Sequence, residues 1–122
     1  MRFWHYVETR EIDQFSVIID WTYEDAPLDS MFDETVSDIE DMARRCNAGI
    51  DTHYIARVRV FYDGHEMGSS TLGSCYAYDC DPADDIEAGI SGYLEDMIEE
   101  AMDEARGEAV KMLDRLKADF LS

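Results

Sequence analysis

Residues 54–62 read YIARVRVFY and are followed by the dipeptide Asp63-Gly64. Large apolar side chains recur at every second position, which is typical of a β-strand. Asp-Gly readily adopts the positive φ angles of a two-residue type I′ turn, and residues 71–78 supply a returning strand. The sequence therefore predicts a β-hairpin here, with bends or bulges at Gly68 and Gly73.

A second pair of strands is expected before this hairpin, over residues 2–8 and 15–24, with the polar residues 9–14 as their loop. The strand over residues 15–24 alternates strictly. One of its faces carries large apolar side chains: Phe15, Val17, Ile19, Trp21 and Tyr23. The other face is expected to point outward, away from the core: Ser16, Asp20, Thr22 and Glu24. This pattern is typical of an antiparallel sheet that is covered on one side.

An amphipathic helix is expected after each pair of strands. The first begins after a cap at Asp25 and has apolar residues three and four positions apart as far as Cys46, which is about five turns. The second extends over residues 82–120. A helix of that length is expected to kink at one of its glycines. The candidate positions are Gly89, Gly92 and Gly107.

The fold class follows from the order of these elements. The order β-β-α-β-β-α predicts a single α+β domain over residues 1–122, with a four-stranded antiparallel sheet and both helices packed on one face. A chain of 122 residues with 46% hydrophobic residues has the length and the apolar content to form one such core.

The charge of the chain is concentrated in two segments. The net charge is −19, and residues 20–41 contain nine acids and no base, while residues 79–104 contain eleven acids and no base. Nucleic acids and anionic membranes bind proteins through clustered Lys and Arg. Direct binding to either is therefore excluded as an expected function. The sequence also has no apolar stretch long enough for a leader or a membrane span.

Acids in the second segment repeat every four residues: Glu95, Asp96, Glu99, Glu100, Asp103 and Glu104. Side chains four residues apart share one face of a helix. Six charges over ten residues is about one per 2.5 Å of helix axis, against roughly one per 1.7 Å in duplex DNA. We expect these six acids to bind a partner. A second group is expected to assist them: Asp29, Asp33, Glu34, Asp38, Glu40 and Asp41.

Motifs for catalysis or metal binding are missing from the sequence. It contains no CxxC or HExxH, and its three histidines are scattered. Residues 79–90 fail as a calcium loop, because Asp84 stands where Gly is needed and Ile90 where a bidentate Glu is needed. We therefore expect no enzyme activity, no metal and no cofactor. The cysteines are expected to be reduced thiols: Cys46, Cys75 and Cys80.

The outer face of the sheet has two alternative interpretations. Arg57 and Arg59 can pair across strands with outward carboxylates such as Asp20 or Glu24. Alternatively they form a self-association face with neighbouring apolar residues, because arginine and aromatic residues are enriched at such interfaces. The residues of that face are Trp4, Ile18, Ile55, Arg57, Arg59 and Phe61.

A small domain with helical acid rows and no catalytic motif resembles the acidic inhibitors that phages and plasmids use against host defence. These are the DNA-mimicking anti-restriction and anti-CRISPR proteins. The resemblance covers size, charge and the acid rows. It implies that the acids occupy the basic DNA or RNA channel of a defence nuclease complex and exclude the nucleic acid by competition. The expected location is the cytoplasm of the host cell.

Other interpretations of the acidic surface remain open at this point. The acids could serve solubility in an adaptor or dimerising module that binds a basic partner. They could also reflect adaptation to high salt. A small enzyme whose site is assembled only by the fold is a further alternative.

Overall fold

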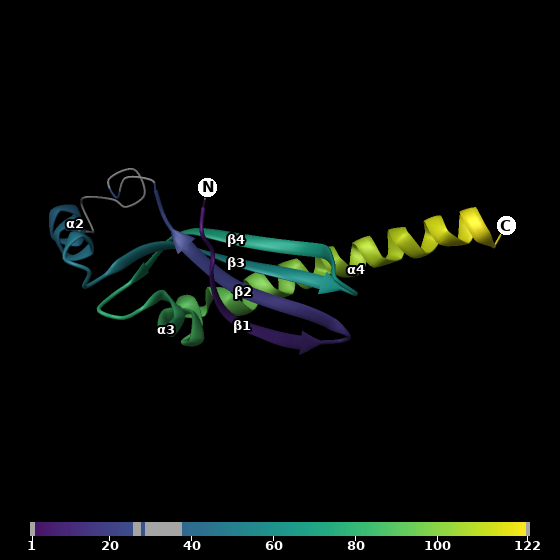
Figure 1. Ribbon diagram of the computed structural model, residues 1–122, viewed down its shortest axis with the longest axis horizontal. Coiled ribbons are helices and arrows are strands. Elements are labelled where there is room, and N and C mark those ends of the chain that lie inside the picture. Colours follow the sequence, from purple (N-terminus) through teal and green to yellow (C-terminus); the bar gives the residue numbers. More distant parts are fainter. Residues whose placement is uncertain (1, 26–27, 29–37, 122) are drawn as a thin grey trace.

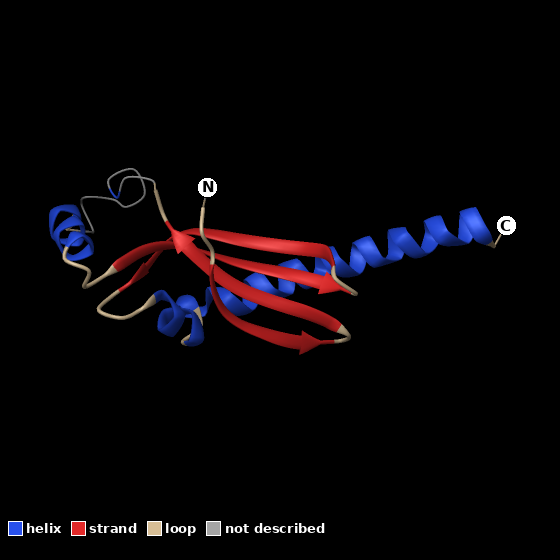
Figure 2. Cartoon of the chain, in the orientation of Figure 1, coloured by secondary structure: helices blue, strands red, loops and turns tan. Residues whose placement is uncertain are grey.

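The computed structural model describes residues 2–25, 28 and 38–121. Within them the strands are β1 (His5–Ile12), β2 (Phe15–Tyr23), β3 (Thr52–Tyr62) and β4 (His65–Ala77). The helices are α2 (Ile39–Asn47), α3 (Pro82–Glu87) and α4 (Tyr93–Phe120), with the short 3₁₀ helix η1 (Ile90–Gly92) before α4. One long sheet results, and α4 crosses it and continues beyond its end (Figures 1 and 2). The prediction of an α+β fold with a four-stranded antiparallel sheet is confirmed within the described residues.

The strands lie side by side in the order β1-β2-β3-β4. Both hairpins close with two-residue turns in which φ is positive, at Asp13 and Gln14 (49° and 72°) and at Asp63 and Gly64 (49° and 79°). The predicted Asp-Gly turn is therefore confirmed. The expected loop over residues 9–14 is wrong, because β1 continues as far as Ile12.

The strand β4 begins at His65 and is longer than the expected strand over residues 71–78. Its pairing with β3 shifts register between Val60 and Phe61 and between Tyr54 and Ala56. Gly68 pairs with Val60 beside the first shift, and Gly73 lies at the second. The predicted irregularities near these two glycines are confirmed.

The core lies between one face of the sheet and α4. Its strand residues alternate as the sequence predicts, and its helix residues form one stripe along α4. Its main members are Phe15, Val17, Ile19, Trp21, Tyr54, Ala56, Val58, Val60, Leu94, Met97, Ile98, Ala101, Met102 and Ala105. Tyr23 and Tyr62, at the ends of their strands, are about half exposed. The core therefore sits over the middle of the sheet.

The expected single helix over residues 82–120 is wrong. α3 ends at Glu87, and Gly89 and Gly92 have left-handed φ angles of 95° and 93° on either side of Ile90 and Ser91. A residue in this conformation cannot continue an α-helix. The chain therefore breaks twice before α4 begins, at Gly89 and Gly92, which confirms two of the predicted kink positions. The third, Gly107, lies inside α4 without interrupting it.

The helix α2 differs from prediction in its start and in its position. Asp38 has φ −84° and ψ 89°, which is not helical, and its Oδ1 accepts a 3.0 Å hydrogen bond from the Asp41 amide. A continuous helix from Asp25 to Cys46 is therefore wrong at this residue, and residues 26–27 and 29–37 lie outside the described part. Figure 1 places α2 beyond one end of the sheet. The expectation that both predicted helices pack on one face is also wrong.

Candidate functional site

The six acids of the predicted row lie on the first half of α4 and are all exposed: Glu95, Asp96, Glu99, Glu100, Asp103 and Glu104. The opposite side of the same half-helix is buried against the sheet at Leu94, Ile98, Ala101 and Ala105. The sequence therefore placed this row correctly on the solvent side of a helix. We refer to these six residues as the acidic face.

Two residues of the acidic face have partners. Glu95 lies 3.3 Å from the Arg10 guanidinium, and Asp103 lies 3.4 Å from that of Arg106. The other four acids make no ion pair within the part of the chain that the structure describes. The negative electrostatic potential of these four carboxylates therefore extends into solvent. Like charges one turn away strengthen this potential, and the buried side of the helix fixes the positions of the carboxylates.

The described members of the second group of predicted acids, Asp38, Glu40 and Asp41, are not joined to this face. Asp38 caps α2, and Asp41 forms an ion pair with Arg44 on the same helix, so both have structural roles. Glu40 is exposed. Asp29, Asp33 and Glu34 lie outside the described residues. In Figure 1, α2 lies past one end of the sheet while α4 extends toward the other.

The outer face of the sheet is organised around Asp20. Its carboxylate accepts hydrogen bonds from Arg57 Nε at 2.8 Å and Arg57 Nη2 at 2.6 Å, and a third from Arg59 Nη2 at 3.1 Å. The Arg57 guanidinium also lies 3.7 Å above the ring of Trp4. Pairing of these arginines with Asp20 is thereby confirmed, and Asp20 lies on the outer face as predicted. Asp20 and Thr22 are nevertheless only 4% exposed.

The other expectations for the outer face have separate outcomes. Glu24 accepts a 3.2 Å hydrogen bond from the Ser74 amide and does not serve the arginines. Arg59 lies 5.3 Å from the ring of Phe61. Ile18 and Ile55 are half-buried on the same face. Self-association through this face stays a prediction.

A buried carboxylate that the sequence did not single out connects α2 to the sheet. Asp51 accepts hydrogen bonds from Arg45 Nε (2.7 Å) and Nη2 (3.1 Å), from the Tyr76 hydroxyl (2.7 Å) and from the Asp79 amide (2.8 Å). Arg45 is the main reason that the pKa of Asp51 is lowered to about 2. Nothing in the local sequence distinguishes Asp51 from the other acids, because two of its partners, Tyr76 and Asp79, lie 25 and 28 residues away in the sequence.

This arrangement predicts a specific acid sensitivity. The lowered pKa means that ionised Asp51 stabilises the fold above about pH 4, and that this contribution is lost as the pH falls toward 2. We expect Asp51→Asn to lower the free energy of unfolding at pH 7 by about 2 kcal/mol. Urea unfolding at a series of pH values measures both effects. The prediction would be contradicted if the free energy of unfolding depended on pH equally in the variant and in the native protein.

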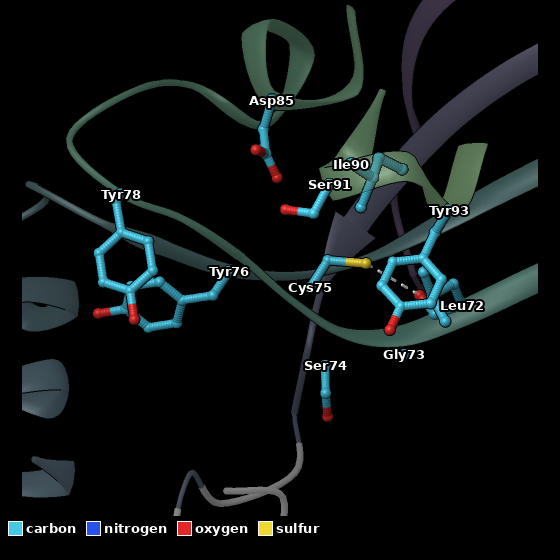
Figure 3. Close-up of a pocket in the computed structure, with 10 residues that line it drawn as sticks. All are labelled: Leu72, Gly73, Ser74, Cys75, Tyr76, Tyr78, Asp85, Ile90, Ser91 and Tyr93. Atoms are coloured by element: carbon cyan, nitrogen blue, oxygen red, sulfur yellow. Dashed lines mark hydrogen bonds between the residues drawn. The ribbon is translucent and has the colours of Figure 1, made fainter. Parts of the chain in front are cut away.

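A cavity of about 340 Å³ lies where β4 meets α3 and the start of α4 (Figure 3). Figure 3 shows Asp85 and Ser91 pointing toward one another across it. The Cys75 thiol donates to the Leu72 carbonyl at 3.4 Å, and burial raises the pKa of Cys75 to about 11. The thiol is therefore protonated at neutral pH and is a poor nucleophile.

The cysteines and the possible metal ligands are the remaining groups that could support chemistry. Cys46, Cys75 and Cys80 are free cysteines. Burial and the surrounding aspartates raise the pKa of Cys80. Across residues 2–25, 28 and 38–121, no three side chains of His, Cys, Asp and Glu are grouped so that they could hold a metal ion. In the same residues, no helix is both long and apolar enough to cross a membrane.

The acidic face is thus the most distinctive surface of the described chain, and Arg57, Arg59 and Asp51 belong to clusters that hold the fold together. Comparison with known proteins does not add to this description. No protein-family model, no curated protein and no solved structure matches the chain.

Proposed function

We propose that the protein is an inhibitor that mimics nucleic acid and blocks the basic DNA- or RNA-binding channel of a host defence nuclease complex. The observation that carries this proposal is the acidic face, in which four exposed carboxylates have no ion-pair partner in the described residues. Such an inhibitor would act in the cytoplasm of the host cell, and the resemblance to anti-restriction and anti-CRISPR proteins supports the same activity.

The arrangement of the charges supports mimicry over simple solubility. The acids lie on a helix whose other side is fixed by Leu94, Ile98 and Ala101 in the core, so their spacing does not depend on a mobile loop. A rigid charged surface does not have to be ordered on binding, which favours affinity. Charge complementarity with a basic channel also accelerates association. Solubility requires neither the regular spacing nor the lack of interspersed bases.

The test is a competition experiment. A panel of purified CRISPR surveillance complexes and restriction nucleases is titrated with labelled duplex DNA, with and without this protein, at increasing salt concentration. We expect at least one of these complexes to lose DNA binding competitively and the inhibition to weaken as salt rises. Inhibition that is indifferent to salt, or the absence of inhibition across the panel, would contradict the proposal.

A charge-reversal variant tests the acidic face itself. The variant combines Glu99→Lys, Glu100→Lys, Asp103→Lys and Glu104→Lys. We expect about 30-fold weaker inhibition, since each exposed charge contributes about 0.5 kcal/mol. The matched control makes the same charge change at exposed acids outside the face: Glu11→Lys, Glu66→Lys, Glu87→Lys and Asp114→Lys. Equal weakening in both variants would show that net charge, and not the acidic face, determines inhibition.

A further inference from the structure

The helix α4 is longer than the sheet that it covers. Its 28 residues span about 42 Å, and every residue from Val110 to Phe120 is exposed. Figure 1 shows this part of α4 projecting beyond the ends of the strands. We refer to residues 110–120 as the overhang.

The apolar stripe of α4 does not stop where the sheet stops. Met102 and Ala105 are buried against the sheet, and positions three, four and seven residues apart continue the same stripe through Ala109, which is half-buried, to the overhang. The exposed members of the stripe are Met112 (45%), Leu113 (51%), Leu116 (48%) and Phe120 (77%). A solvated helix end would carry polar residues at these positions.

The stripe also forms one wall of a groove. A volume of about 360 Å³ lies between the overhang and the adjoining ends of the strands. Asp13, Gln14, Phe15, Tyr62 and Met67 form its other wall. Met112, Leu113 and Leu116 line the helix side. Both walls are predominantly apolar, so a matching apolar element would remove them from water.

Charge reverses along α4. The part up to Ala105 carries the six acids of the acidic face and no base, whereas residues 106–120 carry four bases and three acids. Two such helices repel when they lie side by side in the same direction with their acids together. They attract when they are antiparallel, because the basic end of each then approaches the acidic part of the other.

We propose that the overhang and its groove form a homodimer interface, in which the overhangs of two copies pack antiparallel. With the two-fold axis near Met112, Leu116 of each copy lies opposite Ala109 of the other. Arg115 then approaches Glu108 of the second copy. This contact is isologous and closed, as a stable dimer requires.

A second copy fits this surface better than an anionic membrane does. The whole chain carries a charge of −19, which opposes approach to an anionic lipid surface, and the basic residues of the overhang alternate with Glu108, Asp114 and Asp119. The second copy presents both the apolar stripe and the acidic partners for these bases. The inference does not depend on the proposed function, and the outer sheet face takes no part in it.

Sedimentation equilibrium of the full chain at about 100 µM tests the proposal, since a dimer with a micromolar Kd is populated at that concentration. We expect a dimer. The variant Leu113→Glu with Leu116→Glu is expected to be monomeric, with a Kd for dimerisation raised at least about 100-fold. Both positions are exposed in the single chain, so the variant is expected to fold, which circular dichroism checks.

The matched control is Val110→Glu with Leu121→Glu. It makes the same charge change in exposed residues at the same end of the chain. Val110 lies on the flank of α4, about 100° around the helix from Ala109, and Leu121 lies just past the end of α4. We expect its Kd to lie within about threefold of the native value. A native chain that is monomeric at this concentration overturns the proposal, as does equal dimerisation of both variants. If the protein is monomeric and co-sediments with phosphatidylcholine vesicles, the apolar stripe binds lipid, and the dimer proposal is overturned as well.

Discussion

Replacing Gly68 by alanine is expected to lower the free energy of unfolding by about 3 kcal/mol. A Cβ atom at this position would lie 2.2 Å from the Ala101 carbonyl oxygen and 2.9 Å from the Ala105 amide nitrogen. Both atoms belong to the backbone of α4, so no side-chain rotation relieves the overlap. The helix has to move away from β4, which opens the core along its length. Urea unfolding followed by circular dichroism measures the loss.

Gly107→Ala is the matched control for this prediction. Gly107 lies inside the same helix, and an added Cβ would meet no atom within 4 Å. Alanine favours a helix over glycine by about 0.8 kcal/mol, so this variant is expected to be more stable than the native protein. The same chemical change therefore has opposite signs at the two positions. A Gly68→Ala variant within about 0.5 kcal/mol of the native stability would contradict the close approach of α4 to β4.

The strands and their buried faces could be predicted from the sequence because their signal is local. Val17 and Ile19 in β2, and Val58 and Val60 in β3, are fully buried, as the period of two indicates. The Asp63-Gly64 turn is also a local signal. These elements fix the sheet and the face on which the core forms.

The missed boundaries depend on contacts that are distant in sequence. Residues 65–70 are largely polar, and they form a strand because β3 supplies the hydrogen bonds and α4 packs against Gly68. Gly89 and Gly92 were predicted as kink positions, but a hydrophobic pattern does not encode that both adopt the left-handed conformation and divide the helix into α3 and α4. Gly68 was expected to mark an irregularity, and it also provides the close approach of the helix.

The residues of the candidate site likewise include some that the sequence predicts and some that it does not. The acidic face could be predicted because a helical period places its six acids opposite the apolar stripe. Asp20 and Asp51 could not be separated from the other acids by local sequence, yet both are buried. Asp20 binds Arg57 of another strand, and Asp51 binds Arg45 and the distant Tyr76 hydroxyl. The chain thus uses a few of its acids to hold the fold, whereas four of the six acids of the acidic face make no ion pair within the described residues.

Asp20→Ala is expected to lower the free energy of unfolding by about 3 kcal/mol at neutral pH. The substitution removes three hydrogen bonds and leaves Arg57 and Arg59 side by side on β3 without their carboxylate. Arg57 has an exposed fraction of 20% and is held between Asp20 and the ring of Trp4, so it cannot regain full hydration without leaving that ring. Thermal and urea unfolding measure the loss, and near-ultraviolet circular dichroism of Trp4 reports the change in its surroundings.

A double-mutant cycle separates the ion cluster from the general effect of truncation. Arg57→Ala alone leaves Asp20 paired with Arg59, so we expect a smaller loss than for Asp20→Ala. The double variant is expected to be more stable than the sum of the single losses predicts by about 1–2 kcal/mol, because removal of Arg57 relieves the unpaired charge left by Asp20→Ala. Glu108→Ala, which breaks the exposed pair with Lys111, is the control and is expected to change stability by at most about 0.5 kcal/mol. Additive losses in the cycle would show that Asp20 and Arg57 stabilise the sheet independently.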